Sequence, residues 1–243
     1  MSKDILAVND DGLIVRVTLN RPDEGNAVSD QMAITLTQVL NAAAQTSRLV
    51  VLRGAGKDFC VGRATMGQRP STRPEALVWR RQSDVIFNCY AAFRRCPVPI
   101  VCVVEGRALG FGCAIAGLAD ITLAADTATF QIPEMAHNIM PTMVLSALID
   151  RVPRKALTYL VYSTATISAE RARDCGLVSE IASAADLAGL TQTVCDAIIK
   201  APPPAAEGVK EYLRTAIAMD GPASIEYARS LHATVNSSAE MGR

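Results

Sequence analysis

Short apolar runs recur along this chain and alternate with longer segments in which apolar residues return every three or four positions. Such short runs predict buried strands, and they fall at residues 5–8, 13–19, 49–52, 100–104 and 121–124. The first two runs flank Asp10-Asp11-Gly12, a turn sequence typical of a β-hairpin. The chain is therefore expected to begin with a hairpin and to continue with separate, largely apolar strands.

Helical periodicity fills the intervals between these strands. Ser29 can cap a helix that runs to about residue 45. The apolar face of that helix carries Met32, Leu36, Val39 and Leu40. A second helix is predicted over residues 75–95, where Pro97 and Pro99 end it, and a third begins near Gly110.

Beyond Pro141 the pattern is mainly helical, and breaks are predicted at Pro153, Ser168 and residues 202–204. Residues 67–74, rich in arginine and proline, are predicted to form a loop. Strands that alternate with helices in this way predict an α/β fold.

The length of 243 residues suits one large domain, or one domain with a small appendage. We expect a core domain over residues 1–195 and a helical C-terminal region over residues 196–243. Half of the residues are hydrophobic, which is enough for a substantial core.

The strand at residues 100–104 continues through Gly106, Gly110 and Gly112 directly into an apolar helix. Backbone N–H groups at the start of a helix have no intrahelical partner, and glycine lets a ligand approach them closely. They also lie at the positive end of the helix dipole, where negative charge is stabilised. The sequence therefore predicts a site for an oxyanion. Tight packing of strand against helix, without a ligand, is the alternative that these residues leave open.

Two other kinds of glycine-rich binding motif match this stretch poorly. A dinucleotide fingerprint needs a third small residue where Ile115 stands, and no early βαβ unit precedes the stretch. A phosphate-binding loop needs Lys followed by Ser or Thr, where this chain has Cys113 and Ala114.

Three segments resemble, in order, the signatures of one known family. Residues 54–63, 106–114 and 129–134 are similar to its G-x-G-x-x-F-x-x-G-x-D, G-x-A-x-G-G-G-x-E and F-x-x-P-E patterns. The family is the enoyl-CoA hydratase/isomerase family, the crotonase superfamily. Residues 19–27 and 176–178 extend the resemblance over most of the chain. It implies a spiral of β-β-α units with a helical C-terminal region.

In that family two backbone N–H groups hold the carbonyl of a CoA thioester, and the resemblance assigns these donors to Arg63 and Phe111. It implies a substrate site that also includes Val61, Gly62, Gly110 and Ala114. His137 follows Glu134 by three residues and is a candidate to line the same pocket, the alternative being an ordinary packed or exposed histidine. Proton loss beside a thioester puts charge on the carbonyl oxygen, and each preorganised donor is worth roughly 2.7–4 kcal/mol. Because the donor is a main-chain amide, Phe111 need not abolish the site, although the family usually has glycine there.

The family's hydratases use two glutamates, and only the second is present here, as Glu134; the first position is Ala114. Hydration must orient and deprotonate water while a proton reaches the α carbon, which two carboxylates do naturally. Moving a double bond from a 3-enoyl to a 2-enoyl thioester only shuttles one proton, and one carboxylate suffices. The loss at position 114 therefore favours an isomerase, with Glu134 as base and then acid.

Two other functions remain open. A hydratase, or a hydrolase or lyase of the same family, would recruit a second acid from residues 64–84, such as Glu75 or Asp84. A non-catalytic or CoA-independent member is suggested by Ala114 and by Asp23-Glu24, an acidic pair near the place where the family often has a basic residue for the CoA phosphates.

Charge and composition exclude several partners. Lys and Arg together number 24, as do Asp and Glu, so neither a nucleic acid nor a membrane surface is expected as a partner. No apolar stretch is long enough to cross a bilayer. The partner expected from the resemblance is an acyl-CoA substrate, with coenzyme A entering only as part of the thioester and no bound cofactor. The resemblance also implies a homotrimer or homohexamer.

The seven cysteines include no C-x-x-C pair and have irregular spacings. With no export signal at the start of the sequence, they are expected to be reduced thiols in a cytoplasmic protein. His137 and His232 are the only histidines, so a His/Cys metal site is not expected.

Overall fold

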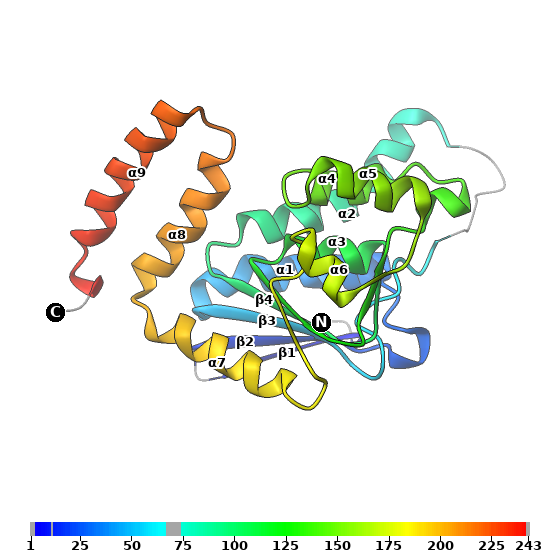
Figure 1. The fold of residues 1–243 in the computed structure, drawn as a ribbon, viewed down its shortest axis with the longest axis horizontal. Helices are drawn as coiled ribbons and strands as arrows, with labels where there is room; N and C mark the ends of the chain where they lie inside the picture. Colours follow the sequence, from blue (N-terminus) through cyan, green and yellow to red (C-terminus); the bar gives the residue numbers. More distant parts are fainter. Residues whose placement is uncertain (1–2, 11, 67–73, 242–243) are drawn as a thin grey trace.

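A six-stranded sheet forms the centre of the computed structural model, which describes residues 3–10, 12–66 and 74–241. In spatial order its strands are β1 (Ile5–Asp10), β2 (Ile14–Leu19), β3 (Leu49–Gly54), β4 (Ile100–Val104), β6 (Ile121–Ala125) and β9 (Glu180–Ala182). The β1–β2 pair is antiparallel, and every later pair is parallel. The predicted hairpin and the three predicted strands that follow it are confirmed (Figure 1).

A second, three-stranded sheet is formed by much shorter strands, which the apolar pattern did not predict. Its order is β5 (Arg107–Leu109), β7 (Thr129–Gln131) and β8 (Ile167–Ser168). The same succession occurs twice: a strand of the large sheet, a short strand of the small sheet, then a helix. The first instance is β4, β5 and α3 (Phe111–Leu118), and the second is β6, β7 and the 3-10 helix η2 (Glu134–His137) with α4 (Thr142–Leu148).

Two long helices, α1 (Asp30–Thr46) and α2 (Ala76–Arg95), pack against each other. The Ser29 side chain accepts a hydrogen bond from the Met32 amide at 3.2 Å, so the predicted N-cap is confirmed. The predicted apolar face of α1 is buried in the core. Every residue of α3 is also buried, which explains why its sequence is apolar throughout.

After η2 the chain is mainly helical, as predicted. The remaining helices are α4, α5 (Arg154–Ser163), α6 (Ala169–Asp174), α7 (Leu187–Lys200), α8 (Pro203–Ala216) and α9 (Gly221–Asn236), with short 3-10 turns η1 (Pro22–Glu24) and η3 (Ala239–Met241). Pro153, Ser168 and Pro202 are the N-caps of α5, α6 and α8, so the predicted breaks are helix starts. No described helix is both long enough and apolar enough to span a bilayer. Of the loop predicted at residues 67–74, residues 67–73 lie outside the described part.

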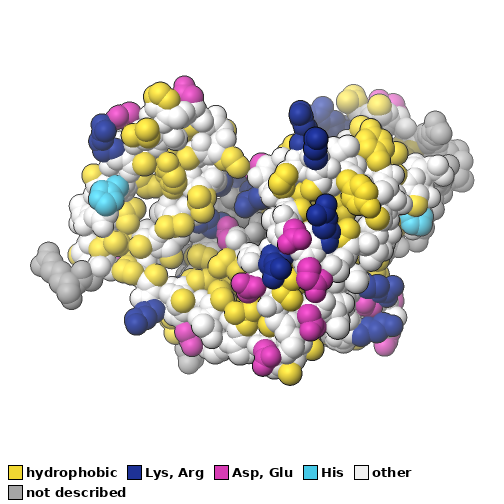
Figure 2. All heavy atoms as spheres, viewed as in Figure 1, with side chains coloured by type: hydrophobic (Ala, Val, Ile, Leu, Met, Phe, Trp, Pro, Cys, Tyr) yellow, Lys and Arg dark blue, Asp and Glu magenta, His cyan; other side chains and the backbone are white. Residues whose placement is uncertain are grey.

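The last two helices form a hairpin that stands apart from the sheets (Figure 1). Lys210 of α8 joins it to the core, because its ammonium group donates to Asp120 at 2.7 Å and to the Val98 carbonyl at 2.8 Å. Hydrophobic side chains gather on the exposed faces of α8 and α9 (Figure 2). The domain boundary predicted at residue 195 falls within α7, which packs on the large sheet, and it stays a prediction.

Candidate active site

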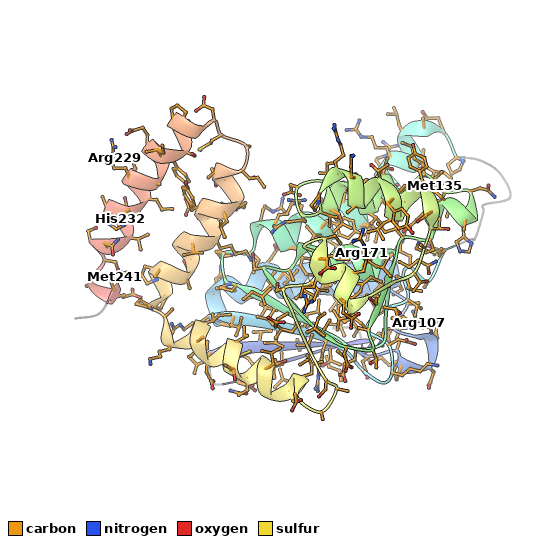
Figure 3. The ribbon with its side chains drawn as sticks, viewed as in Figure 1. Arg107, Met135, Arg171, Arg229, His232 and Met241 are labelled. Atoms are coloured by element: carbon orange, nitrogen blue, oxygen red, sulfur yellow. The ribbon has the colours of Figure 1, made fainter. Side chains whose placement is uncertain are left out.

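The two glycine-rich segments leave the carboxyl ends of β3 and β4, which are neighbours in the sheet. Loops at that edge of a parallel sheet converge, and ligands commonly bind there. Here backbone hydrogen bonds join them: the Cys60 amide donates to the Arg107 carbonyl at 3.0 Å, and the Leu109 amide donates to the Cys60 carbonyl at 2.9 Å. Arg107 lies at the end of the core away from α8 and α9 (Figure 3).

Gly112 allows the start of α3 to approach the first loop closely. A Cβ atom at this position would lie 2.2 Å from the Cys60 carbonyl oxygen, far inside van der Waals contact. Glycine at position 112 is therefore required by the contact between the two loops.

An ion pair between Asp58 and Arg107 also holds the two loops together. Arg107 donates from Nε to Asp58 Oδ1 at 2.9 Å and from Nη2 to Asp58 Oδ2 at 2.8 Å. Asp58 is buried, and the hydrogen bond from Arg107 holds the pKa of its carboxyl below the ordinary value. Neither residue was predicted to belong to the site. The sequence signal that could have revealed them is an acidic residue in the first glycine-rich segment and a basic residue in the second.

Residues 62–64 pair in parallel with Val28, and the Arg63 amide points away from Val28. Val28 donates to the Gly62 carbonyl at 2.8 Å and accepts from the Ala64 amide at 2.9 Å. In such parallel pairing the residue between the two bonds turns its own N–H to the opposite side. Among the described residues the Arg63 amide has no acceptor, while its side chain pairs with Asp30 at 2.5 Å.

The Phe111 amide is at the first position of α3 and so has no acceptor within the helix. No other described residue accepts from it. The Phe111 ring is buried and stacks on Tyr90 of α2, with ring centroids 5.4 Å apart. The larger side chain therefore finds room in the core. Tyr90 was not predicted to be near the site.

Pairing within the small sheet places Glu134 beside the second loop. Strand β7 pairs with β5, and the Gly110 amide donates to the Gln131 carbonyl at 2.9 Å, so the residues after β7 lie beside Gly110. A Cβ atom at Gly110 would lie 2.8 Å from Glu134 Oε1. The predicted acid–base residue and the second glycine loop are thus in direct contact.

The Glu134 carboxyl group is poorly solvated. Its residue is 7% exposed, and Oε2 has no hydrogen-bond partner among the described residues. Burial raises the pKa of Glu134 above its ordinary value of 4.5. A carboxyl group in this state is suited to accepting and returning a proton.

The other predicted site residues divide between the interior and the surface. Gly62 and Ala114 are buried, and the Ala114 amide donates to the Gly110 carbonyl at 2.9 Å. Val61 is half-buried against residue Gly25. His137 is exposed at the end of η2, and its contact with substrate stays a prediction.

The proposed sources of a second acid are on the surface. Glu75 is exposed and caps α2 by accepting from the Leu77 amide, and Asp84 is exposed on the same helix. Of the segment 64–84, residues 67–73 lie outside the described part. Asp23 and Glu24 are exposed in η1, and Glu24 pairs with Arg21.

Within the described residues, no group of three His, Cys, Asp or Glu side chains is placed to hold a metal ion. All seven cysteines are free and buried. Burial raises the pKa of the Cys60 thiol to about 12, so this cysteine of the first loop is not a reactive thiolate at neutral pH.

Comparison with known proteins identifies the family. The family described as enoyl-CoA hydratase/isomerase matches residues 10–243, so the chain belongs to it. Among curated relatives, the peroxisomal enoyl-CoA delta isomerase 3 of Mus musculus is 31% identical over 74% of this chain and 57% of its own length. The 2,3-dehydroadipyl-CoA hydratase of Escherichia coli is 30% identical over 69% of this chain and 65% of its own length.

Solved structures confirm the predicted fold. An enoyl-CoA hydratase of Mycobacterium smegmatis superimposes with a TM-score of 0.91 at 24% identity, covering 98% of this chain and 93% of that one. Human enoyl coenzyme A hydratase domain-containing protein 3 gives a TM-score of 0.90 at 21% identity, covering 98% and 94%. The crotonase-type α/β spiral with a helical C-terminal region is therefore the fold of this chain.

The contact between Gly110 and Glu134 predicts the effect of one added methyl group. Gly110 has φ +49°, and its Cβ would press on the carboxylate. We expect Gly110→Ala to displace Glu134 and to lower kcat/KM for an enoyl-CoA by about 100-fold or more, the low end of a general base's contribution. Gly189→Ala is the matched control, because nothing lies within 4 Å of that position. Equal activity of the two folded variants would contradict the placement of Glu134.

Proposed function

We propose that this protein is an enoyl-CoA isomerase that converts 3-enoyl-CoA into 2-enoyl-CoA. Glu134 removes a proton from C2 of the substrate, and the electrons of that C–H bond move into a dienolate. The same carboxyl group returns the proton to C4, so that no atom is gained or lost. The proposal rests on one buried carboxyl group, that of Glu134 against Gly110 of the second glycine loop, with alanine at position 114.

The two loops supply the electrostatic part of this mechanism. The amides of Arg63 and Phe111 have no acceptor among the described residues, and both follow a glycine of a loop. Each amide aimed at the thioester oxygen stabilises the dienolate by roughly 2.7–4 kcal/mol. The loops are held by main-chain bonds and by the Asp58–Arg107 pair, so little reorganisation accompanies the reaction.

The surroundings of Glu134 favour proton shuttling over hydration. The carboxylate lies against Gly110, which the Met66 methyl group also approaches, and Cys113 is close enough for the Glu134 charge to act on it. Burial, and then the nearby Glu134 charge, raise the pKa of the Cys113 thiol, so this neighbour stays neutral. A hydratase must hold and activate a water molecule, which a single carboxyl group does poorly.

A hydratase is the second candidate, because relatives at similar identity carry that name. A non-catalytic member is the third, suggested by Ala114 and the acidic pair Asp23-Glu24. We propose that coenzyme A enters as part of the substrate and that no cofactor is bound. The seven free cysteines support a reducing, cytoplasmic location.

Glu134→Gln tests the mechanism. We expect the substitution to lower isomerase kcat/KM by about 10²–10⁴-fold, since the shuttling base is lost. In the unchanged enzyme the base must be ionised, so kcat/KM is expected to fall as the pH drops through a pKa above 4.5. That acid limb should be absent from the residual activity of the variant.

The assay uses 2-enoyl-CoA, 3-enoyl-CoA and β-keto thioesters in parallel. Glu75→Gln serves as the control, because this exposed carboxyl group is a candidate second acid. Isomerase turnover that survives Glu134→Gln within tenfold would overturn the assignment. Water addition that depends on Glu75 would favour the hydratase instead.

We further propose that the protein is a homotrimer or homohexamer. The hairpin of α8 and α9 leaves large apolar side chains uncovered, and such a surface is typical of an interface. They include Val209, Leu213, Ile217 and Ile225. Light scattering is expected to give three or six times the chain mass of 25.8 kDa. A mass equal to one chain at micromolar concentration would contradict this proposal.

A further inference from the structure

The Met66 side chain lies over both glycine loops. Its methyl carbon would be 3.0 Å from a Cβ atom at Gly110 and 3.2 Å from one at Gly62. These two glycines immediately precede Phe111 and Arg63, whose amides are the assigned oxyanion donors. One methyl group therefore faces both donor loops.

The same methyl group and the Glu134 carboxylate both lie against Gly110. A Cβ atom at Gly110 would lie 2.8 Å from Glu134 Oε1 and 3.0 Å from the Met66 methyl carbon. A tight turn brings the side chain there, because the Met66 amide donates to the Arg63 carbonyl at 3.0 Å. Met66 is thus attached to the first loop and reaches across to the second.

We propose that Met66 contacts the acyl group at the reacting carbons and selects thioesters that carry no branch there. This inference rests on the proposed function. The carbon that loses its proton must lie against Glu134, and the thioester oxygen must lie between the two loops. Met66 borders both positions, so a methyl branch at C2 would compete with its side chain for the same space.

The selectivity is expected to be moderate. Methionine is unbranched and flexible, so it can shift to admit part of an added group. An extra methyl group against an apolar wall typically changes kcat/KM by about 10- to 200-fold.

Substitutions at Met66 test the specificity directly. The measured quantity is the ratio of kcat/KM for 3-hexenoyl-CoA to that for 2-methyl-3-hexenoyl-CoA. We expect Met66→Ala to lower this ratio about tenfold or more, while Met66→Leu keeps it near the unsubstituted value because the volume is conserved. Met140→Ala is the control, since Met140 is 75% exposed. An unchanged ratio in folded Met66→Ala would overturn the inference.

A second measurement does not depend on turnover. Hydrogen peroxide converts methionine to its sulfoxide by transfer of one oxygen, leaving water. Saturated butanoyl-CoA, at ten times the Kd found by calorimetry, is expected to slow oxidation of Met66 about tenfold and to leave Met140 unchanged. Peptide mass spectrometry follows both residues in the same sample.

The two experiments separate failure of the inference from failure of the proposed function. If no thioester is isomerised but Met66 is protected, the isomerase proposal fails and the contact with the acyl group stands. If 3-hexenoyl-CoA is isomerised but Met66 is neither protected nor selective, the inference fails and the isomerase stands. Absence of butanoyl-CoA binding would overturn both.

Discussion

The site depends on one constraint: two loops from neighbouring parallel strands must pair through their backbones. Cys60 bonds to Arg107 and Leu109 of the second loop, and this pairing is possible only because Gly112 presents no side chain to the Cys60 carbonyl. The Asp58–Arg107 ion pair closes the same junction from the side. The proposed oxyanion site depends on this pairing, since the loops and not the side chains set the direction of the amides at positions 63 and 111.

The second requirement is a carboxyl group held where water is scarce. Oε2 has no partner in the part of the chain that the structure describes, and burial of this kind costs stability. It persists because β5–β7 pairing and the turn at Pro133 fix Glu134 in place. In the proposed mechanism this cost has a chemical return, because a raised pKa makes the Glu134 carboxylate a stronger base. Stability and the proposed reactivity are therefore opposed at this residue.

Much of the fold followed from the sequence because its strands and long helices have clear apolar periods. Ser29, Pro153 and Ser168 mark helix starts through local chemistry, and local signals are readable in a single chain. The strands β5, β7 and β8 have at most three residues, too few for a period to show. The Asp58–Arg107 pair, the stacking of Phe111 on Tyr90 and the position of Met66 join residues from different elements. Contacts of this kind depend on tertiary packing, so the sequence pattern did not reveal them.

The most direct test of the central claim is a crystal structure of the protein with a saturated acyl-CoA. We expect the thioester oxygen to lie about 2.7–3.1 Å from the amide nitrogens of both Arg63 and Phe111. We also expect the Glu134 carboxyl group to face C2 of the acyl chain. A thioester oxygen bound away from either amide, or a Glu134 side chain turned from C2, would contradict it.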